Sequence, residues 1–263
     1  MTPHDGFPAL EWFSQADVLM HLQRHDPSLD LPGCTADLAR CDAWLGQAGF
    51  NTLHYIAVDM IGRRVLRAYL MRELAPMSFT RPYMEDLLCE ADPRLIAARQ
   101  SGFPVAWRVD QLESEMDAGN DRRVEVLTKS LRKHEMNCGV IFSLSAPRTD
   151  LRVAVSLTSD ARDTDWINDR VMGGALAASL TIHRFVQPYI EARSRCARDV
   201  ALASEQEAML ERFVKGLSDQ EIAAALRISL HKVNYHVKAL QKAFNVENRA
   251  QLAYMAARRR RAQ

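Results

Sequence analysis

The sequence predicts an α+β domain, with a central antiparallel sheet flanked by helices, followed by a small all-α helix-turn-helix domain. Three observations lead to this fold class. Residues 140–144 and 151–157 are short apolar runs typical of strands, with a turn between them. Residues 164–193 are expected to form one long helix, bent or ended near Pro188. From residue 202 onward, apolar residues recur at helical spacing, and this part is expected to be helical.

The other elements of the first part follow from apolar spacing and turn signals. Residues 8–25 are expected to form an amphipathic helix, and residues 36–49 a second helix that ends near its glycines. Residues 51–59 have the partly alternating pattern of a strand, whereas residues 64–74 fit either a strand or a helix. Turns are expected at 30–34 and 146–150, and further helices at 76–88, 95–98 and 124–134.

Residues 218–249 predict a helix-turn-helix. Ser218 is a favoured N-cap residue, and Glu221 completes a capping box for a helix over residues 219–226. A short turn follows, and Ser229 caps a second helix. One face of this second helix carries the apolar residues Val233, Val237, Leu240 and Phe244.

The opposite face of the second helix is polar and cationic. Such groups at the start of a helix are what a recognition helix presents to base edges and phosphates. The same spacing is also compatible with an ordinary solvated surface of a helix pair. The candidate DNA-binding residues are Ser229, His231, Lys232, Asn234, Tyr235 and Lys238.

The distribution of charge separates the two parts of the chain. The 263 residues carry a net charge of +1. From Ala201 onward there are 11 Lys and Arg against 6 Asp and Glu, a net charge of +5, so the preceding residues carry −4. A basic module attached to an acidic body is typical of a DNA-binding domain joined to another domain.

Several classes of protein are not indicated. No apolar run approaches the roughly 20 residues of a membrane span, and the N-terminus does not resemble a signal peptide, so we expect a cytoplasmic protein without a membrane partner. The five cysteines are scattered and form no CxxC pair, which argues against a disulfide framework or a zinc site. No nucleophile-elbow, phosphate-loop or dinucleotide motif is present. We therefore expect no enzyme, no catalytic residue, no bound metal and no cofactor other than a small-molecule ligand.

The segments EIAAALRIS, VNYHVK and FNVENRAQL resemble the DNA-binding domain of LuxR-type transcription factors over roughly residues 202–256. Leu210 and Gly216 also fall at positions where that family has leucine and glycine. Gln206 is a departure, because the family usually has glutamate there. The resemblance implies a regulator that binds a two-fold site in double-stranded DNA as a homodimer and contacts RNA polymerase.

Five residues of the first part stand out by type and position: Phe79, Tyr83, Asp92, Trp107 and Gly139. From residue type alone they do not define a site. Aromatic residues at helical spacing are often core residues, and Asp before Pro is often a cap or turn residue. A ligand site and an ordinary core both fit this set.

The spacing of these residues resembles the autoinducer-binding domain of LuxR-type regulators over roughly residues 51–182. That family has a tryptophan, a tyrosine, an Asp-Pro pair, a second tryptophan and a later glycine. Here the corresponding positions are Phe79, Tyr83, Asp92-Pro93, Trp107 and Gly139, with Pro93 and Gly139 in structural roles. The longer interval before Gly139 places an inserted loop at 117–123, and Ser156 falls where several members have a ligand-contacting hydroxyl residue.

The resemblance implies an N-acyl-homoserine lactone as the ligand, or a related small autoinducer. Asp92 would accept a hydrogen bond from the ligand amide N–H, Tyr83 would donate to the acyl carbonyl, and Trp107 would pack against the lactone ring. Phe79 departs from the family, because phenylalanine lacks the indole donor that binds the lactone carbonyl. A non-lactone signal, or no signal, therefore remains an alternative.

The domain organisation predicted from these patterns is an autoinducer-binding-like domain over residues 1–192, a charged linker over 193–201 and a LuxR-type helix-turn-helix domain over 202–263. The long helix at 164–193 is a candidate dimer element. Two hypotheses compete with this one: a regulator whose first domain has lost ligand sensing and acts by dimerising, and an enzyme. The enzyme hypothesis lacks any supporting motif.

Overall fold

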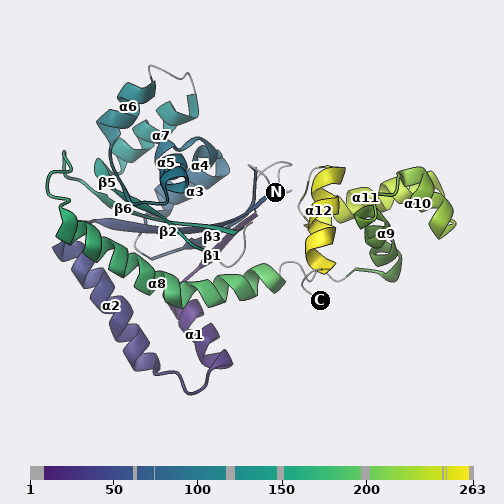
Figure 1. Cartoon of the computed structure of the whole chain (residues 1–263), viewed down its shortest axis with the longest axis horizontal. Helices are drawn as coiled ribbons and strands as arrows, with labels where there is room; N and C mark the ends of the chain where they lie inside the picture. The colour runs from purple at the N-terminus through teal and green to yellow at the C-terminus, as the bar shows by residue number, and fades with distance from the viewer. Residues whose placement is uncertain are drawn as a thin grey trace. The chain divides into compact units, whose positions relative to one another are not determined.

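The computed structural model describes residues 9–61, 64–73, 75–116, 122–146, 151–196, 202–244, 246 and 248–260 (Figure 1). Contacts divide the chain into two compact units. The first unit is Leu10–Ile190, and the second contains the C-terminal part from Glu191. Each unit is described by itself below.

A six-stranded sheet is the centre of the first unit. Its strand order is β1-β3-β2-β6-β5-β4, and the pairs β3–β2, β2–β6, β6–β5 and β5–β4 are antiparallel. This sheet, flanked by helices, confirms the predicted fold class. The strands are β1 (Ala9–Phe13), β2 (Thr52–Ile61), β3 (Arg64–Met71), β4 (Val105–Arg108), β5 (Cys138–Leu144) and β6 (Leu151–Ser159).

Helices cover both faces of this sheet (Figure 1). The group α1 (Gln15–His25), α2 (Leu31–Gln47) and α8 (Asp169–Cys196) covers one face. The group α3 (Met77–Glu85), α4 (Leu88–Ala91), α5 (Pro93–Ser101), α6 (Val109–Met116) and α7 (Arg122–Lys133) covers the other.

Strand β2 shows how the two cores form. Its successive side chains alternate between the faces of the sheet. Leu53 and Tyr55 belong to the core under α1, α2 and α8, whereas Val58 and Met60 belong to the core under α3–α7. A strand buried on both faces is nearly continuously apolar, which explains why residues 51–59 alternate only in part.

The N-terminal segment differs from its predicted single helix. Residues 9–13 form β1, which is hydrogen-bonded to β3 at the edge of the sheet, and the helix starts only after Ser14. Ser14 caps α1 in a capping box with Asp17, which fixes the start of the helix. The expected turn at 30–34 is also shorter, because Asp30 caps α2, which already begins at Leu31.

The remaining expectations concern segment boundaries. The ambiguous segment 64–74 contains strand β3. Helix α8 passes through Pro188 and includes residues 193–196, the first part of the predicted linker. Residues 197–201, most of the expected inserted loop at 117–123 and most of the turn at 146–150 lie outside the described residues.

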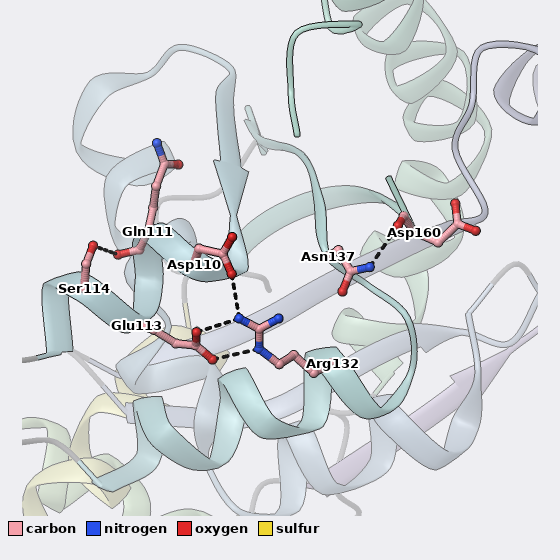
Figure 2. Close-up of polar contacts among 7 residues, drawn as sticks. All are labelled: Asp110, Gln111, Glu113, Ser114, Arg132, Asn137 and Asp160. Atoms are coloured by element: carbon pink, nitrogen blue, oxygen red, sulfur yellow. Dashed lines mark hydrogen bonds and ion pairs between the residues drawn. The ribbon is translucent and has the colours of Figure 1, made fainter. Parts of the chain in front are cut away.

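Arg132 joins α6 to α7 near the start of β5 (Figure 2). Its Nη2 donates to Asp110 and to Glu113 at 2.6 Å each, and its Nε donates to Glu113 at 2.9 Å. In the segment that follows, Asn137 donates to the Asp160 carbonyl oxygen at 2.8 Å. Exposed ion pairs contribute little each, so we regard these contacts as orienting the helices more than stabilising them.

After the end of α8, the described part of the C-terminal unit contains α9 (Ser204–Val214), α10 (Asp219–Leu226), α11 (Leu230–Phe244) and α12 (Arg249–Arg260). Ser218 and Glu221 form the expected capping box, with Ser218 N 2.7 Å from Glu221 Oε2. Arg227 ends α10 in the left-handed region, with φ 55°, and so turns the chain toward α11. The buried core of this unit includes Leu210, Phe213, Ile222, Val233, Leu240 and Leu252.

Candidate ligand cavity and nucleic-acid interface

A cavity of about 460 Å³ lies in the first unit, between the sheet and α3, α4, α5 and α7. Small-molecule sites in proteins range over about 300–1,000 Å³, so this cavity has a suitable size. Its apolar wall includes Ile56, Val58, Met60, Val65, Leu131 and Ile141. Its polar residues include His54, Asp92, Arg94, Ser143, Ser156 and Thr158.

Helix α3 brings Phe79 and Tyr83 to the cavity. The two residues are four apart and lie on the same face of the helix. Their rings stack, with centroids 5.6 Å apart and an interplanar angle of 20°. Phe79 also meets His54 edge to face, with centroids 5.2 Å apart. Both α3 side chains are buried and line the cavity, so two of the predicted ligand residues lie together.

Asp92 is fully buried and paired with Arg94. Its Oδ1 accepts from Arg94 N and Nε, both at 2.9 Å, and its Oδ2 accepts from Arg94 Nη2 at 2.7 Å. The Tyr83 hydroxyl donates to the same Oδ2 at 2.7 Å. The backbone bond also makes Asp92 the N-cap of α5, in which Pro93 is the first residue.

The pairing explains the charge state of this group. Burial raises the pKa of Asp92, but the Arg94 guanidinium and the hydrogen bonds to the carboxylate outweigh burial and hold the pKa below its usual range. Burial and the neighbouring Asp92 carboxylate raise the pKa of Tyr83 well above its ordinary value. The site therefore contains a carboxylate, a guanidinium and a neutral phenol.

Trp107 lies behind Arg94 and is not among the cavity-lining residues. The Arg94 guanidinium carbon is 4.3 Å from the centroid of the Trp107 ring, which is a cation–π contact. Trp107 Nε1 is buried without a hydrogen-bond partner among the described residues. In this structure Trp107 therefore supports Arg94 and does not form a wall of the cavity.

Gly139 is the register partner of Trp107 in the pairing of β4 with β5. A Cβ atom at this position would lie 2.0 Å from the Leu157 carbonyl oxygen and 3.0 Å from Thr158 Cα, both in the backbone of β6. Only glycine permits this approach without a shift of the strands.

We expect Gly139→Ala to destabilise the first unit by about 1–3 kcal/mol, because the added methyl group overpacks two paired strands. The Tm should fall by roughly 2–4 °C per kcal/mol, measured by differential scanning calorimetry. Gly46→Ala is the matched control, because nothing lies within 4 Å of a Cβ there. That helical site should become slightly more stable, and an unchanged Tm of Gly139→Ala would contradict the close approach.

Two further polar residues face the cavity from the sheet. Ser156, in β6, has a buried Oγ without a hydrogen-bond partner in the described part of the chain. His54, in β2, is 3% exposed, and its ring nitrogens lie 3.4 Å from Thr80 Oγ1 and 3.3 Å from Thr52 Oγ1. Burial and the Arg94 charge lower the pKa of His54 from 6.5 to about 3, so its ring is neutral.

The lowered pKa of His54 predicts a loss of stability in acid. The unfolded chain binds a proton at this residue below pH 6.5, whereas the folded chain binds it only near pH 3. The free energy of unfolding should therefore fall with pH in this window by up to about 1.4 kcal/mol per pH unit. Urea unfolding at several pH values in this range measures the free energy of unfolding. It should depend less steeply on pH in His54→Gln than in wild type. Stability of the exposed His25→Gln variant should depend on pH as in wild type. The same pH dependence in all three proteins would show that His54 is not its cause.

Sequence reasoning missed Arg94 and His54 as cavity residues. The signal for Arg94 was its place directly after Asp92-Pro93, where a buried charge next to the candidate carboxylate suggests a pair. His54 gave no such signal, because a single polar residue in an apolar strand is compatible with either face of a sheet.

In the second unit, the predicted DNA-binding face lies on α11. Ser229 accepts from Lys232 N at 3.2 Å and so caps this helix. The side chains of His231, Asn234, Tyr235 and Lys238 are exposed, and the apolar face is directed into the core. Lys232 is exposed as well, and its Nζ donates to Glu205 Oε1 of α9 at 2.6 Å.

Within the described residues, no group of three or more His, Cys, Asp or Glu side chains is placed to hold a metal ion. Over the same part of the chain, no helix is both long and apolar enough to cross a bilayer.

Two family models match the two parts of the chain. The model of the family described as autoinducer binding domain matches residues 38–186. The model of the family described as bacterial regulatory proteins, luxR family, matches residues 201–256. The first match contains the cavity, and the second contains α10 and α11. Among curated proteins there is no significant match.

Similar solved structures include two of the protein SdiA and one of CepR2. Escherichia coli SdiA is 19% identical, with a TM-score of 0.46, over 92% of this chain and 95% of that chain. SdiA in complex with octanoyl-rac-glycerol is 17% identical, with a TM-score of 0.44, over 91% and 93%. CepR2 from Burkholderia cenocepacia, an N-acylhomoserine lactone dependent LuxR family transcription factor, is 14% identical, with a TM-score of 0.46, over 66% and 98%.

The family matches cover both parts of the chain in order and include more than half of its residues. The chain belongs to the LuxR family of bacterial regulatory proteins, which are transcription factors rather than enzymes, and it combines an autoinducer-binding domain with a DNA-binding domain.

Proposed function

We propose that this protein is a ligand-responsive transcription factor that binds a small amphiphilic autoinducer in the cavity of its first domain and a two-fold promoter site as a homodimer. The observation that carries the proposal is the cavity, which combines an apolar wall with a few polar groups. The residues proposed to line the bound ligand are Phe79, Tyr83, Asp92 and Ser156, with Trp107 behind Arg94.

The signal is an N-acyl-homoserine lactone or a related molecule in this proposal. A non-lactone signal is the second candidate, and two observations favour it. Phe79 offers no donor to a lactone carbonyl, and the Asp92 carboxylate, which would bind a ligand amide, is already paired with Arg94.

The exposed face of α11 is the proposed recognition surface. One helix-turn-helix makes few contacts, and a two-fold DNA site matches a protein dimer. We further propose that the homodimer acts in the cytoplasm and contacts RNA polymerase at the promoter. Sedimentation of the full chain with its DNA site should give two chains per duplex.

Two substitutions on α11 should affect DNA binding in different ways. Lys238→Ala should weaken binding to all sequences and reduce the salt slope of log K by about 1, because a phosphate contact carries no sequence information. Asn234→Ala should mainly relax sequence preference, by about 1–3 kcal/mol at one base pair. Gel-shift titrations at several salt concentrations measure both effects.

Lys129→Ala is the matched control, since Lys129 is exposed on α7 of the other unit. It should leave DNA binding unchanged. Wild-type affinity and salt slope in both α11 variants would remove this helix from the interface.

A further inference from the structure

The polar groups of the cavity differ in how much of their hydrogen-bonding capacity is already used. Asp92 accepts hydrogen bonds from three nitrogens of Arg94 and from the Tyr83 hydroxyl. An ionised carboxylate has about four acceptor positions, so this one is saturated. The single hydroxyl proton of Tyr83 is used in the same network. Neither the carboxylate nor the phenolic proton is free for a ligand.

Arg94, in contrast, has donors that its pairing with Asp92 does not use. Its guanidinium carries several N–H donors in a fixed planar fork, and the side-on pair, Nε and Nη2, faces Asp92 at 2.9 and 2.7 Å. The end-on edge, formed by Nη1 and the second N–H of Nη2, is not used in the pairing with Asp92. Arg94 lines the cavity and is 4% exposed. Charged donors that the carboxylate leaves unused, in a side chain that lines a cavity, favour a ligand that brings acceptors.

The other charged residues of the lining point to the same class of ligand. Arg99 and Arg152 line the cavity at exposed positions, and Glu90 is half-buried. Glu90 accepts from Val65 N at 3.4 Å and lies 3.8 Å from Arg123. Because Asp92 is neutralised by Arg94, the cationic side chains exceed the carboxylates that remain. The local charge thus favours an anionic ligand over a cationic one.

The rest of the lining combines the apolar wall with further polar side chains, among them His54, Ser143, Ser156 and Thr158. Ser156 Oγ is buried without a hydrogen-bond partner among the described residues and can donate to a second acceptor. The strand and helix residues of the apolar wall present no other hydrogen-bonding group. An apolar chain fits this part of the cavity, and a polar head fits the part near Arg94.

We infer that the signal is an amphiphile with a carboxylate head group, which accepts two parallel hydrogen bonds from the end-on edge of Arg94 while its apolar chain lies against the cavity wall. A planar fork facing a carboxylate is the geometry of bidentate recognition. This inference rests on the proposed function and deepens it, because it names the class of signal for the same cavity.

The test compares pairs of probes with the same acyl chain, one with a carboxylate head group and one with a neutral head group. Fatty acids from octanoic to tetradecanoic acid are paired with their methyl esters, and N-acyl-homoserines of the same lengths with their lactones. Calorimetry at neutral pH measures the affinities of the full chain, and a gel shift with each probe measures DNA binding. The variants are Asp92→Asn/Arg94→Met, which removes both buried charges together, and Arg99→Gln, which removes an exposed cation of the lining.

In wild type, the carboxylate of at least one pair should bind about tenfold or more tightly than its neutral partner. The ratio of the two affinities should fall to about one in Asp92→Asn/Arg94→Met and should stay at its wild-type value in Arg99→Gln. If the double variant does not fold, the ratio of the carboxylate and neutral affinities in wild type still tests the inference. Tighter binding of the esters or lactones would overturn the carboxylate inference and leave the proposed function intact. If no probe binds and none alters DNA binding, both are overturned.

Discussion

Asp92→Asn should destabilise the first unit by about 3–5 kcal/mol, the largest effect expected for a single substitution in the cavity. The substitution removes one charge of a fully buried pair and leaves the Arg94 guanidinium without its counter-ion. Asparagine keeps the size of the side chain and its ability to cap α5, so neither packing nor capping explains the loss. Urea unfolding followed by far-UV circular dichroism measures the effect.

A second variant separates the charge from other causes. Asp92→Asn/Arg94→Met should recover most of the lost free energy, because replacing both members of a buried ion pair is often neutral or stabilising. The exposed pair of Arg81 and Glu85, at 3.9 Å, offers the control: Glu85→Gln should change stability by less than about 1 kcal/mol. A double variant as unstable as the single one would show that the ion pair is not the cause.

Leu240→Ala should abolish DNA binding by loosening the C-terminal unit. Leu240 is 0% exposed and belongs to the core that positions α11. Removing a buried leucine side chain costs about 2–5 kcal/mol. Small domains are stable by only about 0.05–0.15 kcal/mol per residue, so this unit would lose much of its stability. Hydrogen exchange of α11, measured by mass spectrometry, should rise together with the loss of DNA affinity.

Leu230→Ala is the matched control on the same helix. Leu230 is 44% exposed, and its truncation should change stability by no more than about 0.5 kcal/mol. Ligand binding in the first unit should be the same in both variants. Slow exchange of α11 together with wild-type DNA affinity in Leu240→Ala is the result that would refute this role.

The helix-turn-helix could be predicted almost entirely from the sequence. Its start is fixed by a capping box between Ser218 and Glu221, which are three residues apart. The buried face of α11 repeats at helical spacing, and its exposed residues follow as the complement of that face. These are local interactions, so a single sequence contains all the residues that decide them.

The edge strand β1 and the boundaries of the sheet could not be predicted in this way. Residues 9–13 have no strong pattern of their own and become a strand because they pair with β3, more than 50 residues later in the chain. Strand propensity depends on neighbours across the sheet, and one sequence does not say which segments become neighbours.

The cavity was only partly predictable. The sequence determined that Phe79, Tyr83, Asp92 and Ser156 belong together, through their spacing and the resemblance they carry. The tertiary structure decided which groups remain available to a ligand. Folding buries Arg94 against Asp92 and places Trp107 behind the guanidinium, away from the cavity.

The physical reason for this difference is the cost of burying charge. The sequence places a carboxylate and a guanidinium two residues apart, which is compatible with two solvated side chains as well as with a buried pair. Only the packing of α5 against the sheet removes water from both and makes their pairing obligatory. The sequence by itself determined the DNA-binding unit and the position of the cavity. Tertiary packing decided which polar groups of the cavity remain available to a ligand.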